Sequence, residues 1–292
     1  MFKKFIVATD LSPASEAVVS CLSGIKALGG EHCVLFNCIR LSEAASTAYS
    51  YHYEQREESL ARQKTLLEGQ GFQVEVITTV GTAKREIKRF AVEEDCDLIV
   101  LGAQGNSLAE EKLLGGVAYG VINKSRKPVL VIPVEKNSDK DDLEPIDCFA
   151  FGDHVLFATD FSEMSDLAFY ELEQLVADGV KKVTLVHVQD ETKLDQHLLS
   201  RLEEFNEHDR HRLAELKDAL QKKGNCEIDI EVCYGIPYKE ITRLASERDV
   251  QMIVMGAQGR SFIGDIFLGS VSHRVIVYAR VPVLLIPSSA QG

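Results

Sequence analysis

Three segments of this chain occur twice, in the same order and at a nearly constant separation. The pairs are residues 5–12 (FIVATDLS) with 155–162 (VLFATDFS), 98–105 (LIVLGAQG) with 252–259 (MIVMGAQG), and 128–133 (PVLVIP) with 282–287 (PVLLIP). The first pair is 150 positions apart and the other two are 154 positions apart. Ordered matches at a nearly fixed offset indicate an internal duplication, so both halves must share one architecture.

The duplication also sets the domain boundaries. The 292 residues are enough for two domains of ordinary size. A polar stretch that contains a proline separates the two copies, which is typical of a linker. We therefore predict a first domain at residues 1–135, a linker at 136–151 and a second domain at 152–292.

Each copy alternates short apolar, β-branched runs with longer segments of helical spacing. The second copy predicts strands near 153–159, 181–188, 226–232, 251–255 and 282–286, and helices near 163–177, 192–223, 237–248 and 270–279. Alternating strands and helices predict an α/β fold, a five-stranded parallel sheet with helices on both faces. The expected strand order is 3-2-1-4-5. Ligands of such folds bind at the carboxyl ends of the strands where the order reverses, here between strands 1 and 4.

A glycine-rich loop follows the fourth strand of the second copy. Gly256 and Gly259 flank Ala-Gln, nine residues follow, and Gly269 and Ser270 then open the last helix. Glycines allow close backbone approach, and a helix N-terminus offers N–H donors to phosphate. The loop is neither a Walker A motif nor a GxGxxG fingerprint. On its spacing alone, a phosphate-binding loop and a tight turn are both open interpretations.

The pattern G-x2-G-x9-G-S, with an early Thr-Asp-x-Ser turn and a final [KR]-x-Pro-Val-Leu strand, resembles the universal stress protein family in its tandem form. The resemblance covers both halves. It implies a Rossmann-like fold and the binding of ATP or AMP, with ADP as a further candidate and Mg²⁺ as a companion of ATP. The nucleotide-binding positions that it implies in the second domain are Ala158, Asp160, Val188, Met255, Gly256, Gly259, Arg260, Gly269, Ser270 and Val271.

The first copy departs from this pattern. Gly115 is followed by Gly116 instead of a serine, Asn106 stands where the second copy has Arg260, and two glutamates lie in the spacer. Loss of a hydroxyl donor and added acidic charge both weaken phosphate binding. We predict the second copy to be the stronger site. The corresponding weaker positions in the first domain are Ala8, Asp10, Cys38, Leu101, Gly102, Gly105, Gly115, Gly116 and Val117.

Composition limits the partners. A net charge of −13 argues against nucleic acid and anionic membranes. No apolar run has the length of a membrane span, and no secretory signal pattern is seen. The seven cysteines contain no CxxC pair, so we expect reduced thiols in a cytoplasmic protein. His208 and His211 are interpreted as part of a solvated helix face, and no metal site is predicted.

Three functions remain open from the sequence. The favoured one is a nucleotide-binding regulatory protein of the stress response, with adenine nucleotide as its partner. The alternatives are a slow ATPase or autophosphorylating enzyme and a nucleotide-independent scaffold, and no catalytic residue is predicted. Both copies end in a short apolar strand at residues 129–134 and 283–286. Pairing of these strands would cover two exposed edges and give an intramolecular pseudo-dimer. A homodimer of two chains is a further candidate.

Overall fold

A computed structural model describes residues 1–44, 49–103, 113–136, 143–145, 149–192, 202–259 and 268–288. The elements of the first half are β1 (Lys4–Thr9), α1 (Pro13–Ser20), a 3-10 helix η1 (Ser23–Leu28), β2 (His32–Ile39), α2 (Leu41–Ala44), α3 (Tyr49–Gly69), β3 (Gln73–Val80), α4 (Ala83–Glu93), β4 (Leu98–Gly102), α5 (Gly116–Ile122) and β5 (Val129–Ile132). Then come β6 (Val134–Lys136) and β7 (Leu143–Pro145). The second half contains β8 (Val155–Ala158), α6 (Glu163–Ala177), β9 (Lys182–Asp190), α8 (Leu202–Gln221), β10 (Glu227–Gly235), α9 (Pro237–Glu247), β11 (Met252–Gly256), α10 (Ser270–Tyr278) and β12 (Val283–Ile286).

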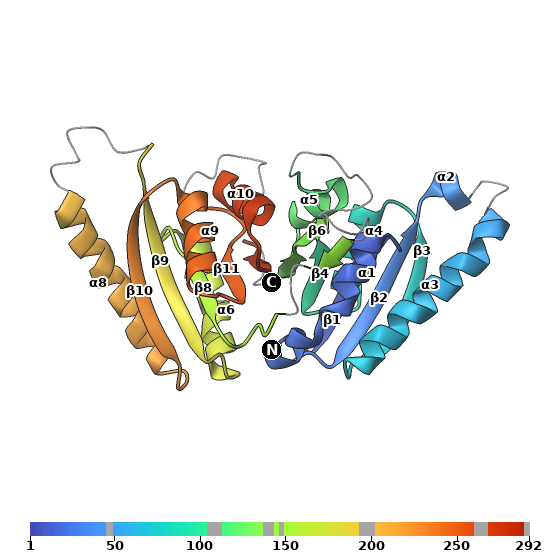
Figure 1. Ribbon diagram of the computed structural model, residues 1–292, viewed down its shortest axis with the longest axis horizontal. Coiled ribbons are helices and arrows are strands. Elements are labelled where there is room, and N and C mark those ends of the chain that lie inside the picture. The colour runs from blue at the N-terminus through green and yellow to red at the C-terminus, as the bar shows by residue number, and fades with distance from the viewer. Residues whose placement is uncertain are drawn as a thin grey trace.

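Both halves have the expected strand order. The full order is β10-β9-β8-β11-β12-β5-β4-β1-β2-β3, so each half reads 3-2-1-4-5 in its own numbering. Pairs within a half are parallel, whereas β12 pairs with β5 in antiparallel register. The two sheets therefore form one ten-stranded sheet whose halves lie side by side (Figure 1). The α/β fold predicted from alternating strands and helices is confirmed.

Local sequence explains where the helices begin. Ser162 is the N-cap of α6, and its side chain accepts a hydrogen bond from the Ser165 N–H. Pro237 occupies the first turn of α9, where its missing N–H costs no hydrogen bond. Both helices begin where the sequence predicts them, near residues 163 and 237.

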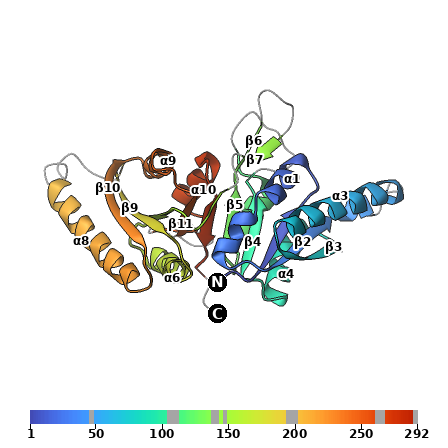
Figure 2. The same cartoon turned by 60° about the horizontal axis from the view of Figure 1, so that its bottom comes forward.

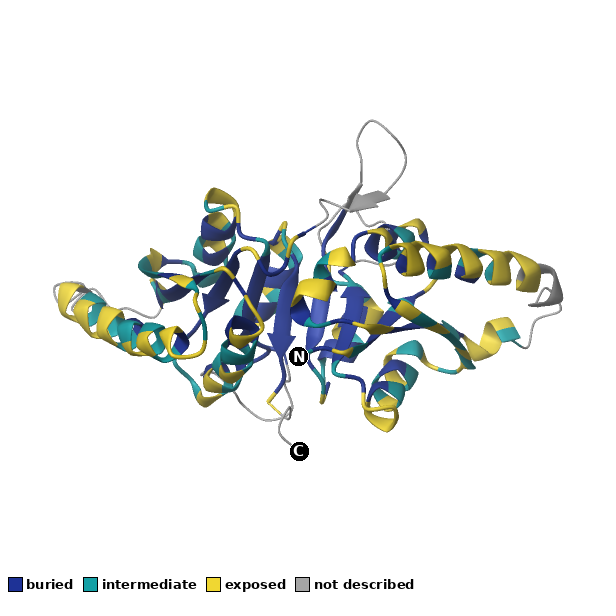
Figure 3. Cartoon of the chain, turned by 90° about the horizontal axis from the view of Figure 1, so that it is seen from below, coloured by how far each residue is buried: buried dark blue, intermediate teal, exposed yellow. Residues whose placement is uncertain are grey.

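The core consists of two apolar clusters, one on each face of the sheet, and each cluster runs through both halves. One contains Phe5 and Phe157, packed beneath α1, α3, α6 and α8; the other contains Ile99 and Ile253, beneath α4, α5, α9 and α10. Figure 3 shows the buried residues concentrated in the central strands, while the outer helices are largely exposed. A parallel sheet covered on both faces explains why its strands are almost continuously apolar.

The segment predicted as a linker contains ordered structure. β6 and β7 form a two-stranded antiparallel pair, and β7 lies beside α1 (Figure 2). The rings of Phe149 and Phe151 stack at 6.4 Å, and both side chains are buried. The Phe149 carbonyl lies so close to Gly24 that a Cβ there would clash with it. These described parts of the segment therefore pack against the first half, a role that their polar surroundings did not predict.

The cysteines depart from the expectation of seven reduced thiols. Cys21 is disulfide-bonded, while Cys33, Cys38, Cys96, Cys226 and Cys233 are free. Burial raises the pKa of Cys96 and of Cys226 to about 11, which makes these free thiols poor nucleophiles. The remaining cysteine of the sequence, Cys148, lies outside the described residues.

A count of reactive thiols tests this difference. Alkylation of the chain in denaturant without reductant is expected to add five labels by intact mass, because a disulfide removes two of the seven thiols. Prior reduction should raise the count to seven. Seven labels without reductant would contradict the disulfide and return the chain to the fully reduced state expected from its sequence.

Among the residues that the structure describes, no helix has the length and apolar character needed to cross a bilayer.

Candidate functional site in the second half

The predicted crevice lies at the carboxyl ends of β8 and β11, where the strand order of the second half reverses. The register of these parallel strands places Met255 opposite Ala158. Because parallel strands end at the same edge, the loops after them meet there. The two segments of strongest repetition in the sequence are thus brought together.

The turn after β8 fixes the carboxylate of Asp160. Phe161 adopts a left-handed backbone conformation with φ of 57°, and its N–H donates to the Thr159 Oγ1 at 2.9 Å. Asp160 Oδ1 accepts from the Ser162 N–H at 3.1 Å and from the Ser162 Oγ at 2.6 Å. A carboxylate held by two donors has a defined orientation at the edge of the crevice.

The glycine loop after β11 approaches that carboxylate closely. A Cβ added at Gly259 would lie 2.5 Å from Asp160 Oδ2, a distance that no side chain could occupy without moving the carboxylate. A Cβ at Gly256 would lie 3.0 Å from the Gln258 carbonyl oxygen and 3.1 Å from that of Met164. A side chain at either position would therefore force a neighbouring group to shift, and neither glycine has a positive φ. The contact joins the two strand ends into one site.

The N-terminus of α10 faces the same loop. Gly269 is its N-cap, and no side chain caps the helix. The Gly269 N–H donates to the Ala257 carbonyl at 2.8 Å, and the buried Ser272 Oγ donates to the Gly256 carbonyl at 3.0 Å. These bonds fix the start of α10 against the end of β11. The first N–H groups of the helix and the exposed Ser270 hydroxyl are then available to an anion.

The apolar residues predicted for the site share one cluster. Ala158 and Met255 belong to the core cluster beneath α9 and α10, and the half-buried Val188 and Val271 pack against it. These four residues form an apolar floor at the strand ends. Such a surface suits the flat face of a purine base, while polar groups around it fix orientation.

The first half repeats much of this geometry. Leu11 has φ of 62°, and Asp10 Oδ1 accepts from the Ser12 N–H at 3.0 Å and the Ser15 Oγ at 2.5 Å. The Gly115 N–H donates to the Ala103 carbonyl at 2.9 Å. Leu101 lies in the same core cluster, with Ala8 and Cys38 packed against it, and Gly102 ends β4. Burial and the nearby Glu86 and Glu43 carboxylates raise the pKa of Cys38, which keeps it a neutral thiol.

The start of α5 differs from the start of α10. Gly116 replaces Ser270 and leaves open space where a side chain would be. Ala118 replaces Ser272, so the hydroxyl that ties helix to strand in the second half has no counterpart. Val117 is 46% exposed, whereas its counterpart Val271 packs against the core cluster. The first half therefore has fewer donors and a less complete apolar floor.

Two of the predicted site positions, Gly105 and Arg260, lie outside the described residues, as do Asn106 and the spacer glutamates Glu110 and Glu111. Among the residues that are described, no group of three or more His, Cys, Asp or Glu side chains could hold a metal ion. His208 and His211 are 71% and 78% exposed, as a solvated helix face predicts.

Sequence reasoning missed the His187 side chain, which packs against the turn that contains Asp160. His187 is buried; its Nδ1 lies 2.8 Å from the Thr159 carbonyl oxygen, and its ring packs 4.6 Å from that of Phe161. The guanidinium of Arg212, on α8, lies over the Phe161 ring, 3.8 Å from its centroid. In the first half the Asn37 amide donates to the Thr9 carbonyl at 2.9 Å instead. The alternation of side chains along β9 gives no signal for this contact.

Comparison with known proteins matches the same two units. A model of the universal stress protein family matches residues 1–133 and 152–287. A universal stress protein of Synechocystis is 25% identical over 286 residues, which is 96% of this chain and 88% of that protein. One from Methanocaldococcus jannaschii is 29% identical over 152 residues, which is 45% of this chain and 93% of that protein.

A solved structure has the same overall arrangement. The crystal structure of a universal stress protein from Archaeoglobus fulgidus superposes with a TM-score of 0.70 at 25% identity, and the match covers 98% of this chain and 97% of that one. The match extends over both halves and over the β12–β5 strand pair that joins them, which we call the seam. The chain therefore belongs to the universal stress protein family and carries two copies of the family's domain in tandem.

Proposed function

We propose that this chain binds an adenine nucleotide, ATP or AMP, in the crevice at the ends of β8 and β11. Through occupancy of this crevice it acts as a regulatory protein of the stress response. The observation that carries the proposal is the close approach of Gly259 to the Asp160 carboxylate. It brings an acceptor for nucleoside hydroxyl or amino groups next to Gly256 and Gly259, whose backbone a phosphate can approach without meeting a Cβ.

The described residues fit such a ligand. Asp160 faces the nucleoside end, where a carboxylate can accept hydrogen bonds from a ribose hydroxyl or the adenine amino group. Ser270 and the first N–H groups of α10 face the phosphates, and the dipole of this helix favours negative charge there. Ala158, Val188, Met255 and Val271 would support the base. The resemblance to the family adds ATP and AMP as the expected ligands.

The two halves are proposed to differ in affinity. Ser270 and Ser272 supply a phosphate donor and a tie between helix and strand, and the first half has Gly116 and Ala118 at these places. Since each neutral hydrogen bond contributes about 0.5–1.5 kcal/mol, these differences favour the second half by roughly tenfold in affinity. The first half is the weaker site.

A matched pair of variants tests this difference by calorimetry on the full chain. Ser270→Gly is expected to weaken ATP binding by roughly three- to tenfold, because it removes one hydroxyl donor. Gly116→Ser, made where a Cβ meets no atom within 4 Å, is expected to strengthen binding in the first half by a similar factor.

Unchanged affinity in Ser270→Gly would remove that hydroxyl from the site. If the titration shows two binding transitions and Ser270→Gly leaves the stronger one unchanged, the tighter site is in the first half. That result would reverse the proposed order of affinities. Analysis of the titrated mixture for ADP and phosphate distinguishes binding from slow hydrolysis.

We also propose that the single chain is equivalent to a dimer of one-domain proteins. The antiparallel pairing of β12 with β5 covers the final strand of each half, and both core clusters continue across it. An exposed apolar strand edge invites association, so closing both edges within one chain removes that hazard. The expected consequence is that the two crevices are held in one rigid unit.

A further inference from the structure

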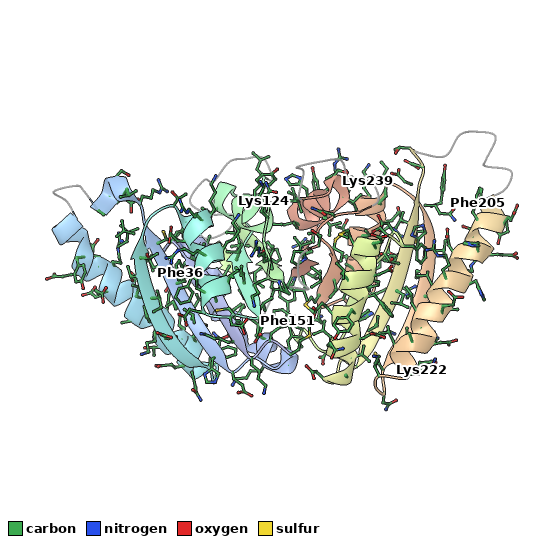
Figure 4. The ribbon with its side chains drawn as sticks, turned by 180° about the vertical axis from the view of Figure 1, so that it is seen from behind. Phe36, Lys124, Phe151, Phe205, Lys222 and Lys239 are labelled. Carbon is green, nitrogen blue, oxygen red and sulfur yellow. The ribbon has the colours of Figure 1, made fainter. Side chains whose placement is uncertain are left out.

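A cavity of about 290 Å³ lies away from the nucleotide crevice, between α4 and the segment that follows α5. Five of its nine lining residues are cationic, and only one is acidic, in a chain whose net charge is −13. The cationic ones are Lys88, Arg89, Lys124, Arg126 and Lys127, and the acidic one is Glu93. Figure 4 shows Lys124 beside the end of α5. We call this site the basic cavity.

Internal ion pairs account for only part of this charge. Arg89 pairs with Glu86 at 2.8 Å and Glu93 at 2.6 Å, and Lys127 pairs with Asp95 at 2.7 Å. Arg126 is exposed and makes no ion pair within the described part of the chain. The cavity therefore keeps a positive field that its own acidic residues do not cancel.

Lys88 lies at the inner wall of the basic cavity. Its Nζ donates to the carbonyls of Gly120 and Asn123, each at 2.8 Å, and so caps the end of α5. Carbonyl oxygens satisfy its hydrogen bonds without neutralising its charge. Burial lowers the pKa of Lys88, and the nearby Lys84 and Lys124 lower it further. Like charges are thus crowded around a half-buried ammonium, an arrangement that a bound anion would relieve.

The second half shows that the fold does not require the lysines of this cavity, although it keeps Arg243 and Arg280 at the positions of Arg89 and Arg126. At the positions of Lys84 and Lys124 it has Tyr238 and Tyr278, whose rings pack 5.3 Å apart. Thr242 occupies the position of Lys88, and α9 and α10 contact each other as α4 and α5 do. The cavity of this half, about 630 Å³, is lined by those aromatic and neutral residues together with fewer cations. Helix packing alone therefore does not explain the lysines of the first half.

We propose that the basic cavity binds a small phosphate-bearing anion, at a site separate from the nucleotide crevices. Its volume is at the lower end of the range for small-molecule sites, which suits a compact ligand rather than a nucleic acid or a protein segment. Guanidinium and ammonium groups at several sides match the oxygens of a phosphate group. The proposal stands on this cavity alone and does not depend on nucleotide binding.

The test is a calorimetric titration of the full chain with inorganic pyrophosphate in a phosphate-free buffer, repeated with excess AMP. Arg126→Glu is expected to weaken pyrophosphate binding at least tenfold, because it reverses one exposed charge at the cavity. Arg280→Glu, the matched change at the same position of the second half, should change affinity less than twofold. Lys124→Glu is a second variant on the same wall, and melting curves check that each variant is folded.

Saturable pyrophosphate binding that AMP leaves intact and Arg126→Glu weakens would support the proposal. No saturable binding, equal loss in Arg126→Glu and Arg280→Glu, or complete displacement by AMP without an effect of either cavity variant would overturn it. In the last case pyrophosphate would be a ligand of the nucleotide crevice only. Binding of an acidic peptide without pyrophosphate would equally contradict a small-anion site.

Discussion

Replacing Gly259 with valine is expected to abolish nucleotide binding by the second half, with affinity falling on the order of a hundredfold or more. The physical reason is the 2.5 Å between an added Cβ and Asp160 Oδ2. The larger side chain must displace the carboxylate and occupy the space between the two strand ends. The Asp160 carboxylate is the end of a side chain, so it can move without displacing the backbone. The expected damage is therefore confined to the binding site. Calorimetry with ATP and with AMP on the full chain measures the loss.

Gly69→Val is the matched control. Gly69 ends α3, and a Cβ there meets nothing within 4 Å. The nucleotide affinity of the Gly69→Val variant should therefore equal that of the unmodified chain. Both variants should melt within a few degrees of the unmodified protein. If Gly259→Val bound ATP with unchanged affinity while correctly folded, the crevice between Asp160 and the glycine loop would not be the binding site.

Shortening either leucine at the seam between the halves is expected to destabilise the whole chain. Leu130 of β5 and Leu284 of β12 are register partners in the antiparallel pair, and both side chains are fully buried in one core cluster. Leu130→Ala and Leu284→Ala should each reduce the free energy of unfolding by about 2–5 kcal/mol, since each removes buried apolar volume. Urea denaturation followed by circular dichroism measures the effect.

The double variant tests whether the seam is shared. Residues in direct contact give non-additive effects, so Leu130→Ala with Leu284→Ala should cost less than the sum of the single changes, by roughly 0.5 kcal/mol or more. Leu185→Ala with Leu35→Ala is the control pair: both are fully buried but lie on the separate strands β9 and β2, and their effects should add. Strict additivity at the seam would contradict the continuous sheet and the pseudo-dimer proposed from it.

The fold followed from the sequence because two independent patterns agreed. The duplication required two similar units, and the alternation of β-branched runs with helical spacing required a parallel sheet in each. Most element positions came from these patterns, including the helix starts near residues 163 and 237. The strand order 3-2-1-4-5 was taken as the usual order of such folds, and the structure has it. The apolar character of the final strands also indicated that their edges needed a partner.

The parts that sequence reasoning missed depend on contacts between distant segments. The polar stretch between the copies gave no indication that β7 would lie on α1 or that Phe149 would pack over Gly24. The link from His187 to the Thr159 carbonyl joins positions 28 residues apart, and strand alternation reports only which face a side chain takes. The disulfide at Cys21 was missed because the spacing of cysteines says nothing about which sulfurs meet in space.

The sequence indicated the residues of the candidate site but not the contacts that they make. The glycine spacing named Gly256 and Gly259, but only the structure supplies a cause for each: two backbone carbonyls beside Gly256 and the Asp160 carboxylate beside Gly259. The serine at the start of α10 was expected to contact phosphate. Two residues later, Ser272 binds the Gly256 carbonyl and sets the position of the helix, a contact that gives no signature in the sequence.

A crystal structure of the full chain grown with ATP tests the central claim most directly. We expect nucleotide density in the second half, with the ribose or base at Asp160 and the phosphates at Gly259 and the start of α10, at higher occupancy than in the first half. Density in the first half alone, or an empty second-half crevice at millimolar ATP, would contradict it.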